Sequence, residues 1–240
     1  MPPVSVPLLP VSAILSTWLG SVLAGLAQVD GLLTSLESAG PEQVVVGLEA
    51  DPVPLVLAVG TLRRSGGSGC SLALPAPGDP AGLAGPPAFN ARALEAGQAV
   101  VVTGSGLGLV PEPTPHGIAW RAEDAQVPPP PDLYQAGSDL RRQLTETTHR
   151  LVELDVARWR PEIADLLTDL RHDGAAPLPP DLDQRRVETV DRALLCREVV
   201  GLAVGHEGGA VTAAEIEARR QALVPLERAA RHALVAACSV

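Results

Sequence analysis

The residues best placed to do chemistry in this sequence lie in and just after a long loop, Pro75 to Asn90. This stretch of sixteen residues, PAPGDPAGLAGPPAFN, has no regular periodicity, and irregular segments of such length inside a domain often bind ligands. It contains the chain's only phenylalanine and only asparagine. Phe89 could close over a ligand together with Asp79, Asn90 and Arg92. The alternative, favoured by the Pro and Gly content of the loop, is that Phe89 anchors the loop to the core.

Two further residues are candidates for the same ligand site. His116 follows three prolines and precedes an apolar segment, so it could face the same end of a sheet as the loop, and Arg121 comes shortly after it. No histidine is spaced from another histidine or a cysteine as metal ligands are, so no metal site is predicted. The chain's histidines are His116, His149, His172, His206 and His232.

The glycine-rich stretch Thr103–Pro113 (TGSGLGLVPEP) could be a phosphate-binding loop or a structural turn. A dinucleotide-binding loop opens a helix, and the prolines at 111, 113 and 115 forbid one there. A P-loop needs a lysine, and the sequence has none. We therefore favour a structural turn and predict no cofactor.

No recognisable active site is present, so enzyme activity stays open and the sequence favours a non-enzymatic role. There is no Gly-x-Ser-x-Gly elbow, and Cys196 falls inside an apolar helical pattern. The three cysteines, Cys70, Cys196 and Cys238, are odd in number and lack Cys-x-x-Cys spacing. This pattern argues against disulfides and structural zinc and predicts a cytoplasmic protein.

The tripeptide Arg158-Trp159-Arg160 places a large aromatic side chain between two guanidinium groups just before Pro161. Such a group can anchor a helix junction, which we favour, or a surface that binds a partner.

The elements that must position these residues divide at the run Val127–Asp132 (VPPPPD). Residues 1–127 contain ten acidic residues and four arginines, whereas residues 128–240 contain eighteen and fourteen, with leucines at helical spacing. We predict an α+β protein in which 1–127 form an α/β layer with N-terminal helices and 128–240 form a helical bundle or cap. The two segments could also be one continuous domain.

In the first segment the pattern predicts helices near 12–28 and 31–38, separated at Asp30-Gly31, and a short helix at 88–97 closed by a glycine. Apolar, β-branched runs predict a mixed sheet of four to five strands. These runs are Val44–Leu48, Leu55–Gly60, Ser71–Leu74, Ala99–Gly104 and Gly117–Ala122.

In the second segment four amphipathic helices are predicted. The residues that should begin them are Ser138, Pro161, Asp181 and Thr212.

Charge and hydropathy exclude two classes of partner. The net charge is −10, and neither segment has the basic surface that a phosphate backbone attracts, so nucleic-acid binding is not expected. The first 29 residues carry no charged side chain, but their leucines and valines follow steps of three and four. This spacing is typical of a helix packed on one side, so no membrane segment is predicted.

Two strings, LPAPGDPAGLAGPPAFNARALEAGQAVV and ARRQALVPLERAARHALVAAC, resemble a group of uncharacterised proteins from GC-rich bacteria. The resemblance implies a natural bacterial domain and brings no activity, cofactor or catalytic residue. We predict a non-enzymatic interaction or scaffold protein that forms a homodimer, because its apolar stripes need partner faces. The alternative is a small-molecule binder or enzyme that uses the 75–90 loop.

Overall fold

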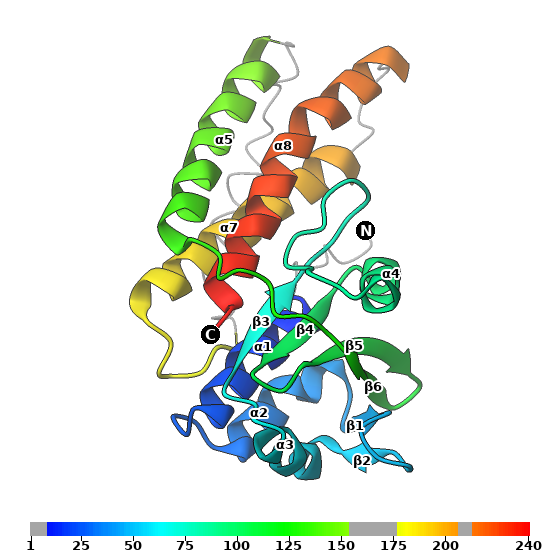
Figure 1. Cartoon of the computed structure of the whole chain (residues 1–240). Coiled ribbons are helices and arrows are strands. Elements are labelled where there is room, and N and C mark those ends of the chain that lie inside the picture. The colour runs from blue at the N-terminus through cyan, green and yellow to red at the C-terminus, as the bar shows by residue number, and fades with distance from the viewer. Residues whose placement is uncertain (1–8, 154–176, 206–212) are drawn as a thin grey trace.

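A mixed sheet lies below a group of long helices in the computed structural model, which describes residues 9–153, 177–205 and 213–240 (Figure 1). The α+β class predicted from the sequence is confirmed. No helix in the described ranges is long and apolar enough to cross a bilayer.

The sheet has six strands in the order β2-β1-β6-β5-β4-β3. β1 is parallel to β6, and the other neighbouring strands are antiparallel. The prediction of four to five strands was too low because it lacked β2 and β5. The strands are β1 (Glu42–Val46), β2 (Val53–Pro54), β3 (Gly69–Ala73), β4 (Ala99–Thr103), β5 (Leu107–Thr114) and β6 (Gly117–Asp124).

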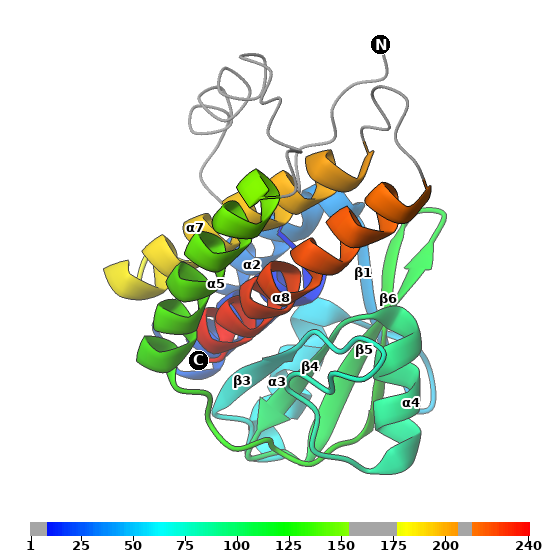
Figure 2. The same ribbon diagram turned by 90° about the horizontal axis from the view of Figure 1, so that it is seen from above.

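Helices cover both faces of this sheet (Figure 2). One face packs against α1 (Val11–Leu23), α2 (Val29–Leu36) and α3 (Leu55–Arg64), and the other against α4 (Pro87–Ala96). A 3-10 turn, Glu37–Ala39, follows α2. Strand β4 is buried on both sides, which explains why its apolar run does not alternate with polar residues.

The break between the two N-terminal helices comes earlier in the chain than predicted. Gly25 has φ of 78°, a left-handed conformation that glycine adopts at no steric cost, and it follows the end of α1. Asp30 and Gly31 instead lie inside α2. The predicted helix at 88–97 is confirmed as α4, and Gly97 closes it with φ of 68°.

The run Leu55–Gly60, predicted as a strand, is the start of helix α3, so that prediction was wrong. Its buried side chains are spaced at i, i+3, i+4 and i+7, which is the pattern of a helix with one apolar side. These side chains are Leu55, Ala58, Val59 and Leu62.

Strand β5 was not predicted because its sequence contains Pro111 and Pro113, which cannot donate to a sheet ladder. β4 pairs with β5 only as far as Leu109, whereas β6 pairs with β5 along its whole length. The two prolines therefore lie where β5 has one neighbour, a position at which a missing N–H is tolerated. The glycines at 104 and 106 form the turn from β4 into β5, as expected of a structural turn.

Three long helices of the second segment are described: α5 (Leu133–Glu153), α7 (Gln184–Gly205) and α8 (Ala213–Cys238). α5 begins before Ser138, because Asp132 Oδ1 accepts a hydrogen bond from the amide of Gln135 at 2.9 Å. Asp183, rather than Asp181, accepts the first amides of α7. The helix predicted from Pro161 and the predicted start at Thr212 lie outside the described residues.

The end of α8 joins the helices to the sheet. Val240 pairs with Cys70 of β3 through two backbone hydrogen bonds of 2.5 and 2.7 Å. Arg186 of α7 donates to the carbonyls of Ala236, Ala237 and Ser239, which have no partner within the helix. Hydrogen bonds therefore attach the residues that follow α8 to the edge strand β3.

Both compositional segments contribute to one apolar core. Leu19 of α1 and Leu109 of β5 belong to the same buried cluster as Leu140 of α5 and Leu234 of α8. The division into 1–127 and 128–240 stays a prediction.

Candidate functional site

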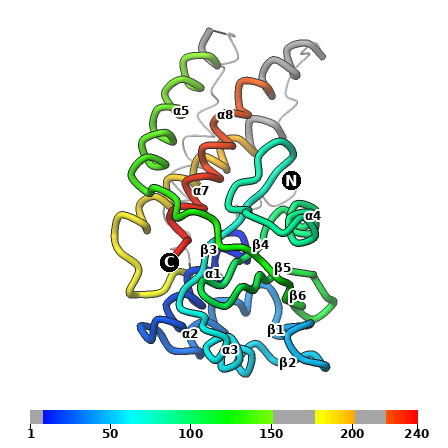
Figure 3. The backbone as a smooth tube through the Cα atoms, in the orientation of Figure 1, coloured from blue at the N-terminus to red at the C-terminus, as the bar shows by residue number. Residues whose placement is uncertain are grey.

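The loop between β3 and α4 turns back on itself and rises beside α8 (Figure 3). Ala76 and Asp79 exchange backbone hydrogen bonds of 2.8 and 2.9 Å around Pro77 and Gly78. Gly78 has φ of 77°, as the third residue of a type II turn requires, and proline is common just before it. The sequence Ala-Pro-Gly-Asp thus fixes where the side chain of Asp79 leaves the loop.

Asp79 is buried, with 6% of its surface exposed, and its carboxylate meets three side chains of α8. Oδ2 accepts a hydrogen bond from Nη2 of Arg231 at 2.9 Å, and Nε2 of His232 lies 2.9 Å from Oδ1 and 3.0 Å from Oδ2. Nε of Arg228 lies 3.5 Å from Oδ2. Because two neighbouring turns of one helix supply all three groups, Asp79 fixes the loop against α8.

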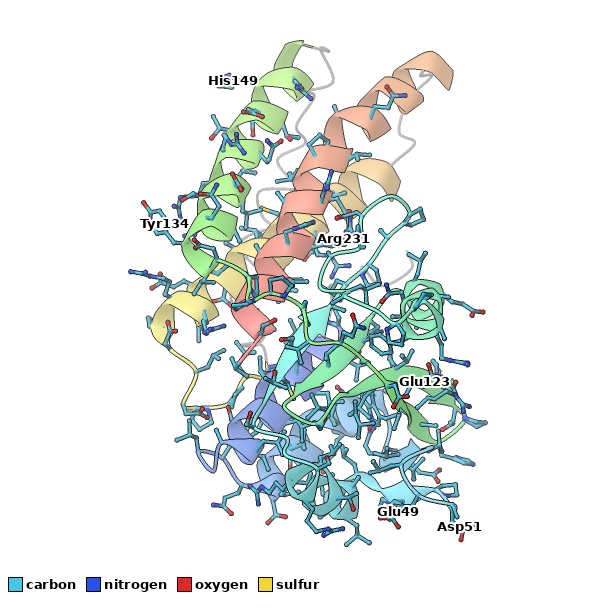
Figure 4. All side chains as sticks on the ribbon, in the orientation of Figure 1. Glu49, Asp51, Glu123, Tyr134, His149 and Arg231 are labelled. Carbon is cyan, nitrogen blue, oxygen red and sulfur yellow. The ribbon has the colours of Figure 1, made fainter. Side chains whose placement is uncertain are left out.

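Arg231 extends this network away from the loop. It lies on α8 (Figure 4). It is 9% exposed, and besides Asp79 it donates to the carbonyl of Leu74 at 3.0 Å and to Glu227 at 3.0 Å. Burial lowers the pKa of the Arg197 guanidinium on α7, the charge of Glu227 raises it and that of Arg231 lowers it again. We name Asp79, Arg197, Glu227, Arg228, Arg231 and His232 the Asp79 network. Its two carboxylates face three guanidinium groups.

A groove of about 750 Å³ runs along the exposed side of this network. Its walls come from α5, α8, the proline run before α5 and the loop that carries Asp79. The lining residues are Leu72, Gly82, Leu83, Pro128, Pro129, Pro130, Pro131, Asp132, Gln135, Ala136, Asp139, Arg142, Gln143, Pro225, Arg228, Ala229, His232, Val235 and Ser239.

Arg228 and His232 are the members of the Asp79 network that enter the groove. The side chain of Arg228 is 58% exposed and that of His232 is 45% exposed, whereas that of Arg231 is 11% exposed. The two lie four residues apart and so share one side of α8. The guanidinium of Arg228 and the imidazole of His232 therefore face the groove, and the buried carboxylate of Asp79 fixes both.

The other charged groups of the groove already have close partners. Arg142 pairs with Asp139 at 2.6 Å, and Asp139 also accepts a hydrogen bond from Gln135. Asp132 accepts the amide that begins α5. The hydroxyl of Ser239 donates to the carbonyl of Val235 and accepts the amide of Leu72.

Of the loop residues singled out in the sequence, Phe89 and Asn90 have structural contacts. Phe89 is fully buried on the α4 face of the sheet, in a cluster with Ala73, Ala93 and Val101. Asn90 Oδ1 accepts the amide of Gly85 at 3.1 Å. Asp79, unlike Phe89, contacts two residues that line the groove, Arg228 and His232.

Arg92 and Arg121 are brought together elsewhere, on the α4 face of the sheet. Arg92 pairs with Glu123 at 2.5 Å, and Arg121 donates to both oxygens of Glu112 at 2.5 and 2.9 Å. The hydrogen bond from Arg121 holds the pKa of Glu112 below its ordinary value. Figure 4 shows Glu123 beside the sheet, well away from Arg231 on α8. These four side chains form a partly exposed charge cluster.

The remaining predicted residues do not join the groove in the described structure. His116 is exposed in the turn between β5 and β6. Arg158, Trp159 and Arg160 lie outside the described residues, so their proposed role at a partner surface stays a prediction. No group of three or more acidic, histidine or cysteine side chains suited to a metal ion occurs in the described part of the chain.

Sequence reasoning missed Arg228, Arg231 and His232. Their signal is weak but present: together with Glu227 they place four polar side chains at i, i+1, i+4 and i+5 of a helix that is otherwise rich in Ala, Leu and Val. A polar side on a helix that packs into a core calls for a buried partner of opposite charge. Nothing in the sequence shows that the partner is Asp79, which lies 152 residues away from Arg231.

The fold and the groove define an α+β protein with a helical extension and a groove at their junction. Residues 12–136 match the model of the Rv1486c-like protein N-terminal domain, and residues 134–235 match that of the Rv1486c-like protein C-terminal domain. The chain belongs to the Rv1486c-like protein family. The resemblance to uncharacterised proteins of GC-rich bacteria is thereby confirmed.

Two relatives from Mycobacterium tuberculosis are similar to this chain. Uncharacterized protein Rv1486c of strain ATCC 25618 / H37Rv and uncharacterized protein MT1533 of strain CDC 1551 / Oshkosh are each 37% identical to it over 125 residues. Each match covers 42% of this chain and 43% of the relative, so it spans less than half of the relatives' length. No solved structure matches the chain.

Proposed function

We propose that this chain is a non-enzymatic binding protein that holds a small organic molecule in the groove between α5, α8 and the 75–90 loop. The observation that carries the proposal is the Asp79 network, which fixes Arg228 and His232 at the groove wall from a buried carboxylate. A site whose polar groups are held by such a second layer binds with little loss of side-chain entropy. The volume of about 750 Å³ is within the range of roughly 300–1,000 Å³ common for small-molecule sites.

The groups around the groove favour binding over covalent catalysis. The hydroxyl of Ser239 is hydrogen-bonded as both donor and acceptor, so no base activates it. The three thiols are buried, and burial raises the pKa of Cys196 to about 11 and that of Cys238 to about 12, which keeps both in the unreactive neutral form. Free cysteines also support the cytoplasmic location that we propose.

A thermal-shift screen of organic acids, phosphates, sugars and amines tests this function. A ligand present at 100 times its dissociation constant should stabilise the protein by about 2.7 kcal/mol. Ala136→Trp fills the groove from α5 and should abolish the shift. Ala91→Trp makes the same chemical change at an exposed position of α4 and should leave the shift intact. Silence across the panel, or a shift that persists in Ala136→Trp, would contradict the proposal.

A second candidate is self-association as a scaffold, favoured by two apolar side chains on α3. The stripe of α1 that suggested a partner face is buried within the chain itself. Val56 and Leu57, however, are 43% and 63% exposed next to the short edge strand β2. For this candidate, light scattering should give the mass of two chains, and Leu57→Asp should reduce it to one. A mass of one chain for the unaltered protein at micromolar concentration would count against it.

A further inference from the structure

We infer that the ligand of the groove is an organic acid with an apolar body, whose carboxylate is bound by Arg228 and whose adjacent hydroxyl donates a hydrogen bond to His232. This inference rests on the binding function proposed above and names its ligand class. Three features of the groove support it: the charge balance of the Asp79 network, the orientation of the imidazole and the apolar surface beside both groups.

The first feature is one positive charge in excess. The carboxylates of Asp79 and Glu227 are shared by three guanidinium groups, and Arg231 takes the short contacts, 2.9 Å to Asp79 and 3.0 Å to Glu227. Arg228 is left with a 3.5 Å approach to Asp79, lines the groove and has more than half of its side chain exposed. A guanidinium held in this way presents its free N–H groups to a carboxylate, with which it makes strong charge-assisted hydrogen bonds.

The second feature is the direction in which His232 faces. Nε2 points at both oxygens of Asp79, and a carboxylate partner places the proton of a neutral imidazole on that nitrogen. Nδ1 is then a hydrogen-bond acceptor, and no hydrogen bond to it is found within the described ranges. An acceptor next to a guanidinium suits a ligand that carries a donor next to an anion, which is the arrangement of a 2-hydroxy acid.

The third feature is the surface against which the rest of the ligand would lie. Leu83 and Val235 line the groove, and the prolines at 128–131 form a rigid wall that needs no ordering on binding. Of the two acids of the groove, Asp139 is paired with Arg142. Asp132 accepts the amide that begins α5, where the positive end of the helix dipole offsets part of its charge.

Calorimetric titration of the full chain with three probes of equal apolar body tests the inference. Mandelate has both the carboxylate and the hydroxyl, phenylacetate lacks the hydroxyl, and 1-phenylethane-1,2-diol lacks the charge. Mandelate should bind most tightly, with phenylacetate about tenfold weaker and the diol about 10- to 100-fold weaker, as expected for loss of a neutral and of a charged hydrogen bond.

Variants at Arg228 show whether this residue binds the carboxylate of the ligand. Arg228→Gln should weaken mandelate binding by about 10- to 100-fold, Arg228→Lys should recover part of it, and the exposed Arg64→Gln on α3 should have no effect. Because Arg228 is largely exposed, its loss leaves the fold intact, which an unchanged Tm checks. Failure of mandelate to bind, equal binding of all three probes, or binding that survives Arg228→Gln would overturn the inference. If the diol binds as well as mandelate and Ala136→Trp blocks both, the binding function stands and the acid specificity fails.

Discussion

Replacing Asp79 with alanine lowers the free energy of unfolding by about 3–5 kcal/mol, the range measured when one partner of a buried ion pair is removed. Arg231 then keeps its charge in a position that is 9% exposed and has lost its contact with Asp79. His232 and Arg228 lose the same carboxylate, and the loop loses its attachment to α8. Chemical denaturation of both proteins, at a pH where carboxylates are ionised, measures the difference.

Two controls separate this effect from a general cost of removing an acid. Asp51→Ala changes an exposed aspartate at the far end of the sheet and should alter the free energy of unfolding by less than about 0.5 kcal/mol (Figure 4). The double variant Asp79→Leu/Arg231→Met removes both charges and should lose less than Asp79→Ala does, because no buried charge remains alone. A loss below about 1 kcal/mol for Asp79→Ala would show that Arg231 finds solvent or another partner, and would remove the support for a rigid groove wall.

The elements that the sequence predicted well are those with a local signal. The stripe Leu15, Leu19 and Val22 predicted a helix packed on one side. α1 buries all three, but ten of its thirteen residues are buried, so it is covered on more than that side. α4 ends at Gly97 because a left-handed residue closes the helix there. In such cases the spacing of apolar residues and the conformational preference of glycine decide the structure without help from distant residues.

The elements that were predicted wrongly have signals that several structures share. A short aliphatic run such as Leu55–Gly60 fits a buried strand and the buried side of a helix equally well, and only packing against β1 and β2 decides between them. The prolines of β5 argue against a strand unless it is known that β4 pairs with β5 only as far as Leu109. Both decisions depend on contacts between segments far apart in the chain.

Only one half of the candidate site was predictable from the sequence. The length of the loop pointed to Asp79, and the structure places its buried carboxylate behind the groove, in contact with His232 and Arg228, which line it. Its partners come from α8, where His232 looked like one of several scattered histidines. Since pairing between residues 79 and 232 depends on how the helices dock against β3, no local pattern could identify it.

Replacing Phe89 with alanine lowers the free energy of unfolding by about 3–5 kcal/mol, as is usual for a fully buried phenylalanine. Phe89 is the only aromatic residue of its cluster, in which most neighbours are alanines that leave room for the ring. Phe89→Leu should lose roughly half as much, since it fills part of the cavity. Leu94→Ala, at a half-exposed position of the same helix, should have an effect below about 1 kcal/mol. A loss for Phe89→Ala as small as that of Leu94→Ala would contradict the anchoring role.

The glycine opposite Phe89 shows that the ring, rather than a ligand, occupies this space. A Cβ atom at position 108 would overlap the Phe89 ring and the side chain of Ala125, so Gly108→Ala should cost about 1–3 kcal/mol in the unaltered protein. In the Phe89→Ala background the same change should cost less, because the ring is gone and the added methyl group occupies part of its cavity. A favourable coupling in this double-mutant cycle would mean that Gly108 is small in order to admit Phe89. Equal costs in the two backgrounds would mean that the backbone of β5 or Ala125, and not the ring, sets the size of the residue at this position.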